Sequence, residues 1–135
     1  MTLLINSPLQ KYQQSSVQTA SRGQLIIMLY DGAIRFTRQG IAAIEESNIQ
    51  ATNHNLQRTQ TIIHELVACL DMKYPIAQNL VLVYEYMLRR LIEANIKKKK
   101  EPAEEVLSYL LELKEAWVQA AKSSTAPQSH ETTYG

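Results

Sequence analysis

Apolar side chains recur every three or four residues along four stretches of the chain, the spacing of amphipathic α-helices. The stretches cover residues 21–46, 51–70 and 75–95, and a fourth begins near position 102 and continues to about 122. The connections near 47–51, 71–75 and 96–101 are short, and short links favour antiparallel neighbours. The pattern therefore predicts an all-α fold, an antiparallel up-down-up-down four-helix bundle.

The two ends of the chain lack this periodicity. Residues 1–20 are rich in Gln, Ser and Thr with only scattered apolar positions, and residues 123–135 are polar with one proline. Such segments bury too little apolar surface to order themselves. We expect a mobile N-terminal arm over 1–20, the bundle over 21–122 and a disordered tail over 123–135.

Composition narrows the class of protein. The chain has 135 residues, which suits one domain, and its 14 basic and 13 acidic side chains give a net charge of +1. A nucleic-acid binder normally carries a basic excess, so no nucleic-acid partner is expected. The chain shows neither a secretory signal nor an apolar stretch long enough to insert in a membrane, and its single cysteine, Cys69, cannot form an internal disulfide. A cytoplasmic location follows as the expectation.

Motifs for catalysis are missing from the sequence. His64 and Glu65 begin like a zinc-protease helix, but Ala68 stands where the second histidine would be needed. No glycine-rich phosphate loop is present, and Cys69 lies in an apolar helix where a small hydrophobic residue is expected. The sequence thus predicts no catalytic, cofactor-binding or metal-binding residues, no cofactor and no enzyme activity.

Several features indicate a binding protein instead. Tyr84 and Tyr86 lie two apart on one helix, so they cannot both face the core, and Tyr12 stands alone in the polar arm. A bundle with broad apolar arcs can bind an amphipathic segment in a groove between helices. The lysine run at 97–100 could contact an acidic partner, but cations at a helix C-terminus are also favourable in themselves, and this second interpretation is preferred.

Three segments resemble a known family when they are taken together. LYDGA at 29–33, YEYMLRRLIEAN at 84–95 and the late Trp117 resemble the flagellar export chaperones of the FliS family. The likeness covers about residues 9–122 in the same order and with near-constant spacing. Many members carry a Gly-Gly pair in the middle loop, whereas this chain has only the short link 72–75, which puts any contact of that loop in doubt.

The resemblance implies a function. Proteins of this family are not enzymes; they bind the C-terminal disordered region of newly made flagellin in the cytoplasm, prevent its premature polymerisation and help deliver it to the type III export apparatus. The family's N-terminal segment, here with Leu9 and Tyr12, can cover the apolar groove and is implicated in contact with the export gate. A regulatory protein that competes or cooperates with flagellin is a further partner.

A groove for the flagellin segment is predicted on the second and third helices, although its apolar members are equally good core candidates. Its residues are Leu66, Leu70, Ile76, Leu80, Tyr84, Met87, Leu91 and Asn95. An uncovered groove would favour self-association, so the sequence leaves open whether the free chain is a monomer or a homodimer. The alternative function is a helical-bundle adaptor or regulatory protein that binds another helical partner.

Overall fold

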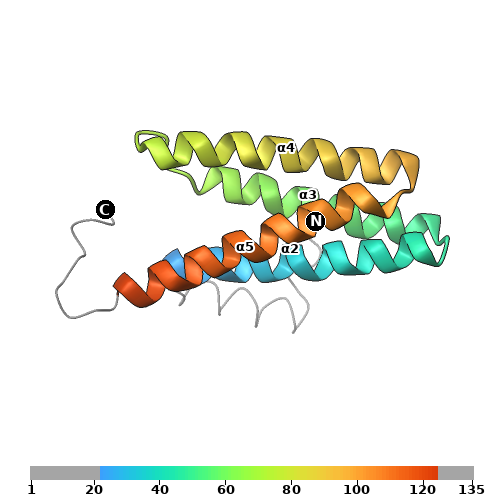
Figure 1. Ribbon diagram of the computed structural model, residues 1–135, viewed down its shortest axis with the longest axis horizontal. Coiled ribbons are helices and arrows are strands. Elements are labelled where there is room, and N and C mark those ends of the chain that lie inside the picture. Colours follow the sequence, from blue (N-terminus) through green and yellow to red (C-terminus); the bar gives the residue numbers. More distant parts are fainter. Residues whose placement is uncertain (1–21, 125–135) are drawn as a thin grey trace, which may run out of the picture.

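Four helices make up the part of the chain that the computed structural model describes, residues 22–124 (Figure 1). They are α2 (Arg22–Glu45), α3 (Ile49–Ala68), α4 (Pro75–Lys97) and α5 (Lys100–Ser124). The predicted all-α class is confirmed, and each helix lies within a few residues of the stretch predicted for it. The expectations for the arm 1–20, including Leu9 and Tyr12, and for most of the tail 123–135 lie outside the described residues.

Local sequence explains where the helices begin and end. The Asn48 side chain accepts a hydrogen bond of 3.0 Å from the backbone N–H of Ala51, which caps α3. Pro75 occupies the first turn of α4, where its missing N–H costs nothing. Lys98 adopts the left-handed conformation with φ of 53° and ends α4, so the chain reverses within two residues into α5.

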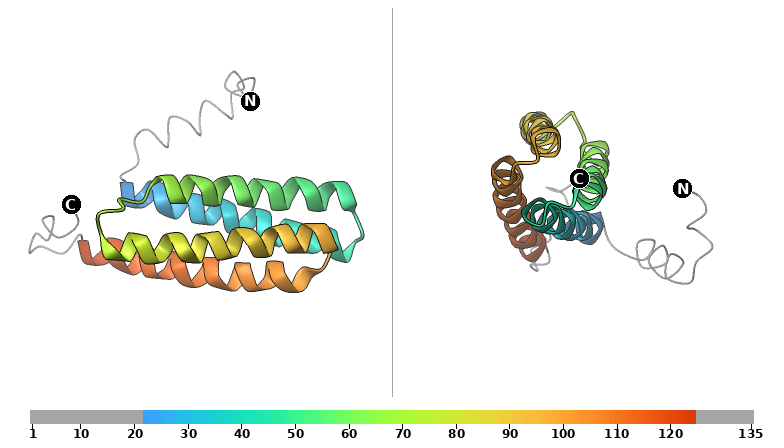
Figure 2. Two further views of the ribbon diagram at one scale, coloured as in Figure 1. Left: turned by 90° about the horizontal axis from the view of Figure 1, so that it is seen from above. Right: turned by 90° about the vertical axis from the view of Figure 1, so that its right-hand side faces the viewer.

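The helices pack as an antiparallel bundle in which α2 lies between α3 and α5, and α4 closes the other side between the same two neighbours (Figure 2). The pair α2–α3 is therefore opposite the pair α4–α5. The contact between α2 and α3 is the most extensive, whereas α4 packs less extensively on α3 and α5. Of the four helices, α4 therefore packs least extensively on its neighbours.

Small residues on α2 allow the close approach of α3. A Cβ atom placed on Gly40 would lie 2.5 Å from Cδ2 of Leu56, and one on Gly32 would lie 3.2 Å from Cδ1 of Ile62. Gly32 is the helix-interior glycine of the LYDGA segment, and its position explains why glycine is tolerated there despite its low helix propensity. Beside this contact, the hydroxyls of Thr37 and Thr59 lie 3.1 Å apart in the core.

Candidate functional site

Four members of the predicted groove lie in the core of the bundle. Leu66, Tyr84, Met87 and Leu91 are each at most 1% exposed, so in this conformation they offer no surface to a partner. The Tyr84 hydroxyl is hydrogen-bonded to the hydroxyl of Tyr30 on α2. The prediction that only one of Tyr84 and Tyr86 faces the core is confirmed, since Tyr86 lies half-buried at the surface.

Burial also favours the neutral, protonated form of both tyrosines. Burial raises the pKa of Tyr30, a shift that hydrogen bonds with Tyr84 and Trp117 oppose. The pKa of Tyr84 is raised by burial first and then by the neighbouring Tyr30. Both phenols therefore stay neutral at physiological pH and act as a polar contact inside the core.

Three other members of the predicted groove lie at the end of the bundle where α3 leads into α4. Ile76 is 65% exposed, and Leu70 and Leu80 are half-buried against the core. Nearby in the chain, Met72 and Tyr74 are also exposed in the α3–α4 connection. This end of the molecule thus exposes apolar side chains to solvent.

The facing side of α5 supplies a second apolar wall. Tyr86 of α4 and Tyr109 of α5 meet edge to face with ring centres 6.2 Å apart, which fixes the register of the two antiparallel helices. One turn further along α5 from Tyr109 comes Leu113, and the next turn brings Trp117; both are half-buried against the core. On the antiparallel helix α4, Val83 lies one turn before Tyr86, and Leu80 lies one turn before Val83.

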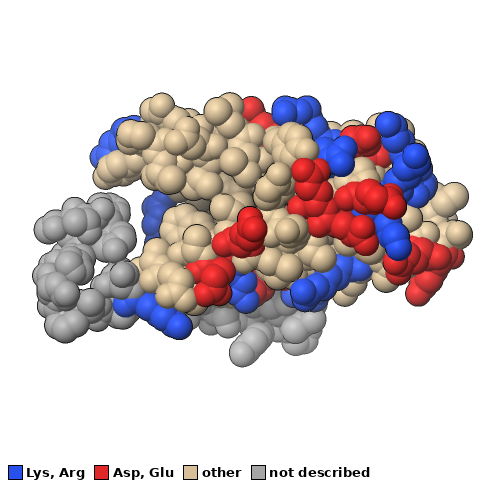
Figure 3. All heavy atoms as spheres, in the orientation of Figure 1, with Lys and Arg blue, Asp and Glu red and all other residues tan. Residues whose placement is uncertain are grey.

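An apolar cleft results between the N-terminal half of α4 and the C-terminal half of α5. Figure 3 shows the surface hollowed between these two segments, with few charged side chains over that part of α4. We call this hollow the α4–α5 cleft. Helical spacing assigns its walls to Ile76, Leu80, Val83, Leu113, Trp117 and Ala120.

A cluster around Glu105 closes the other half of the α4–α5 junction. The carboxylate of Glu105 accepts hydrogen bonds from the Tyr86 hydroxyl at 2.8 Å, from Arg90 Nε at 2.7 Å and from the Tyr109 hydroxyl at 3.3 Å. These bonds, first from Tyr86 and then from Arg90, hold the pKa of Glu105 below its ordinary value. The cleft therefore ends where this polar contact begins.

Glu93 extends the cluster along α4. It accepts hydrogen bonds from Arg90 at 2.6 Å and from Lys97 at 3.2 Å, and these bonds, with that of Lys97 the stronger cause, lower its pKa. The spacing of Tyr86 and Arg90, and that of Glu105 and Tyr109, is one helical turn in each case. That repeat is the signal in the sequence that could have indicated the cluster.

Asn95 lies at the opposite end of α4 from the cleft. Its side-chain oxygen accepts a hydrogen bond of 2.8 Å from Lys98 Nζ, which also reaches Asn53 at 2.9 Å. Nineteen residues of helix separate Asn95 from Ile76, a distance of roughly 28 Å along the axis. The eight predicted groove residues therefore do not form one continuous surface.

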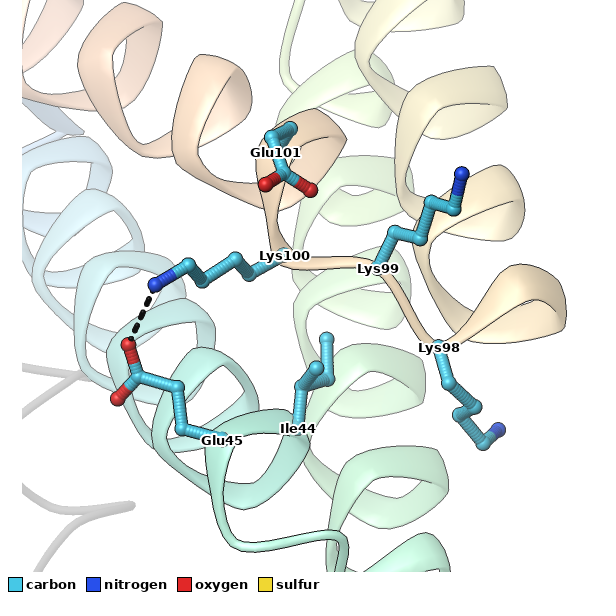
Figure 4. A pocket seen from close by; sticks show the side chains of 6 residues that line it. All are labelled: Ile44, Glu45, Lys98, Lys99, Lys100 and Glu101. Atoms are coloured by element: carbon cyan, nitrogen blue, oxygen red, sulfur yellow. Dashed lines mark hydrogen bonds and ion pairs between the residues drawn. The ribbon is translucent and has the colours of Figure 1, made fainter.

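Three residues of the lysine run, Lys98, Lys99 and Lys100, line an open depression of about 560 Å³ beside the end of α2 (Figure 4). Lys100 pairs with Glu45 at 3.0 Å, Lys97 pairs with Glu93, and Lys98 is held by the two asparagines described above. Three of the four lysines thus have partners that stabilise the turn between α4 and α5. This arrangement agrees with the preferred interpretation of the run as a helix-terminal feature.

Within residues 22–124 no three His, Cys, Asp or Glu side chains come together as they would to hold a metal ion. Over the same span, none of the helices combines the length and apolarity needed to cross a bilayer. His64 is exposed, and Cys69 is half-buried as a free thiol at the end of α3. The described geometry is that of a binding surface made of apolar side chains.

Comparison with known proteins identifies the family. The family described as "Flagellar protein FliS" matches residues 5–124 of the chain. The flagellar secretion chaperone FliS of Bacillus subtilis (strain 168) is 39% identical over 121 residues, which cover 90% of this chain and 91% of that protein. The protein of the same name from Salmonella typhimurium (strain LT2) is 35% identical over 119 residues, covering 86% and 88% of the two chains.

A third relative, flagellar secretion chaperone FliS of Escherichia coli (strain K12), is 31% identical over 118 residues, which cover 85% of this chain and 87% of that protein. The matches span the bundle rather than one motif, so they include both walls of the α4–α5 cleft and the Glu105 cluster. The chain belongs to the FliS family of flagellar secretion chaperones, a family of chaperones and not of enzymes.

Proposed function

We propose that this chaperone acts in the cytoplasm on flagellin. It binds the C-terminal disordered region of newly made flagellin, prevents premature polymerisation and helps deliver the subunit to the type III flagellar export apparatus. Membership of the FliS family supports a flagellar export client. The single structural observation that supports a binding role is the α4–α5 cleft, an apolar hollow on a helix that its neighbours cover incompletely.

The cleft suits a segment that folds as it binds. A disordered chain with apolar residues at helical spacing can lay one face against Ile76 and Leu80 on one side and Trp117 on the other. Burial of apolar surface favours binding by about 25 cal/mol per Å². The ordering of the client offsets part of that gain, which keeps the complex reversible for release at the export apparatus.

The Glu105 cluster limits how far such a segment can extend. Glu105 is bonded to Tyr86, Arg90 and Tyr109 at the centre of the α4–α5 junction. A client that continued between the two helices would have to break these charge-assisted bonds. We therefore expect the bound segment to leave the surface before it reaches the level of Tyr86.

The first experiment is calorimetric titration of the full chain with its cognate flagellin and with flagellin that lacks the C-terminal disordered segment. Tight one-to-one binding that is lost on truncation supports the proposal. Equal binding of both forms would place the contact elsewhere on flagellin, and binding of neither would leave the adaptor alternative, with another helical partner.

A matched pair of variants tests the cleft. Ile76 is 65% exposed at the cleft and Ile96 is 75% exposed near the other end of the same helix. We expect Ile76→Asp to weaken flagellin binding at least about tenfold, because a charge would be buried against an apolar segment. Ile96→Asp should leave the affinity unchanged. Equal effects of the two changes would contradict the assignment of the cleft.

The N-terminal arm has a separate proposed role. Leu9 and Tyr12, outside the described residues, are proposed to contact the export gate. Tyr12→Ala should then keep flagellin affinity by calorimetry while lowering flagellin secretion in cells. A loss of affinity equal to the loss of secretion would assign Tyr12 to flagellin binding instead.

A further inference from the structure

Two arginines lie over one aromatic ring at the junction of α2 and α3. The guanidinium carbon of Arg35 is 5.0 Å from the ring centre of Phe36, and that of Arg58 is 4.8 Å from it. Phe36 is half-buried, while both arginines are exposed. The two cations come from different helices, so the fold, and not the sequence neighbourhood alone, brings them together.

Neither of these charges is paired with a carboxylate in the described part of the chain. Asp31 lies one helical turn before Arg35 on α2, but it pairs with Lys114 of α5 at 2.7 Å, and Glu45 pairs with Lys100 of α5 at 3.0 Å. Among residues 22–124, neither Arg35 nor Arg58 takes part in an ion pair. Glu65 is seven positions beyond Arg58, which is roughly 10 Å along α3.

Arg38 is a further cation of α2, but it lies two positions after Phe36 and therefore on the other side of the helix. It is exposed one turn after Arg35, and it has no ion pair among the described residues either. We call Arg35, Phe36 and Arg58 the basic face. A chain with a net charge of only +1 thus holds, over one aromatic ring, two arginines without an ion pair within the four helices.

We propose that the basic face docks an acidic segment of a partner protein. A guanidinium stacked on an aromatic ring is held in place, so less rotamer entropy is lost when its planar fork binds a carboxylate in a bidentate contact. Carboxylates placed between Arg35 and Arg58 would also relieve the repulsion between the two cations. Charge complementarity therefore selects Asp and Glu side chains as the bound groups.

A protein segment fits this face better than a nucleic acid does. Single-stranded nucleic acids gain much of their binding energy by stacking bases on exposed aromatic rings. Here the protein's own arginines already lie over the Phe36 ring. The basic face also belongs to the α2–α3 pair, opposite the α4–α5 pair (Figure 2), so its occupant and a segment in the α4–α5 cleft can be bound together.

The test uses the full chain and two fluorescein-labelled peptides, one alternating Glu with Ser and one alternating Gln with Ser. Fluorescence anisotropy at low salt should show binding of the Glu peptide alone. The double variant R35E/R58E should weaken that binding at least about tenfold. The control is Arg89→Glu, because Arg89 also lies over a tyrosine ring, that of Tyr86 at 5.9 Å, but on α4.

Each other outcome overturns the proposal. Failure of the Glu peptide to bind, equal binding of the Gln peptide, or an equal loss in Arg89→Glu would show that the basic face has no special affinity for acidic segments. Competition by a single-stranded oligonucleotide that is as strong as that of unlabelled Glu peptide would indicate a general polyanion site. The cleft variant Ile76→Asp should bind the Glu peptide normally, which separates this result from the test of flagellin binding.

Discussion

Arg90 on α4 donates a hydrogen bond of 2.7 Å to Glu105 on α5 and thereby fixes the C-terminal half of α4 to its neighbour. The same carboxylate also accepts from Tyr86 and Tyr109, so one acidic side chain joins three groups. In the cleft half, the side chains of Leu80, Val83, Leu113 and Trp117 that pack beside this junction are apolar. The α4–α5 junction is thus polar and closed at one end, and apolar and open at the other.

The Glu105 cluster makes stability depend on pH. Because the folded-state pKa of Glu105 lies below its ordinary value, the stabilisation by its charged form is fully present above the ordinary pKa and is lost as the pH falls through the lowered pKa. Glu105→Gln should therefore lower the melting temperature at neutral pH and show a smaller difference from the parent in acid. Thermal melts followed by circular dichroism between neutral and acidic pH measure this difference in melting temperature.

Glu112→Gln is the control for that change, since Glu112 is exposed on the same helix and has no bonded partner among residues 22–124. Its melting curves should follow those of the parent at every pH. A difference for Glu105→Gln that stays constant with pH would mean that the carboxylate charge is not what stabilises the junction.

The buried tyrosine pair predicts a non-additive double mutant. Removing the hydroxyl of Tyr84 leaves that of Tyr30 short of a partner in the core, which costs about 1–3 kcal/mol. Tyr84→Phe and Tyr30→Phe should each destabilise the bundle, while the double variant should cost less than their sum. Urea unfolding of all four proteins measures the coupling, and additive effects would show that the hydroxyls do not interact.

Glycine substitutions test the close contact of α2 and α3. An added methyl group at Gly40 meets the buried side chain of Leu56 at 2.5 Å, whereas one at Gly23 meets nothing within 4 Å. Gly40→Ala should destabilise the protein by about 1–3 kcal/mol. Gly23→Ala should be neutral or stabilise it by up to about 1 kcal/mol. Similar effects at the two positions, measured by urea unfolding, would contradict the close packing.

The N-terminal cap of α3 can be tested by Asn48→Ala. Its side chain satisfies the backbone N–H of Ala51, and loss of such a cap costs about 1 kcal/mol. Asn48→Ser or Asn48→Asp should retain most of the stability because both side chains can accept the same bond. If Asp and Ala behave alike in urea unfolding, the cap does not contribute as described.

Helical periodicity was sufficient to predict the four helices, because this pattern is local and acts over one or two turns. Pro75 in the first turn of α4 and Asn48 as the cap of α3 agree with the preferences of these residue types at helix starts. The short links likewise predicted antiparallel neighbours. The family resemblance added the function, which the residues alone indicated only as binding.

Periodicity could not separate core from cleft. It places Ile76, Tyr84 and Leu91 on one broad apolar arc of α4, but it does not show how far the neighbouring helices cover that arc. The tertiary structure leaves Ile76 uncovered and buries Tyr84 against Tyr30, a partner 54 residues away. The sequence by itself determined which residues share a helix face. Only the packing of α4 against α3 and α5 decided which part of that face remains open, because coverage depends on contacts between distant segments.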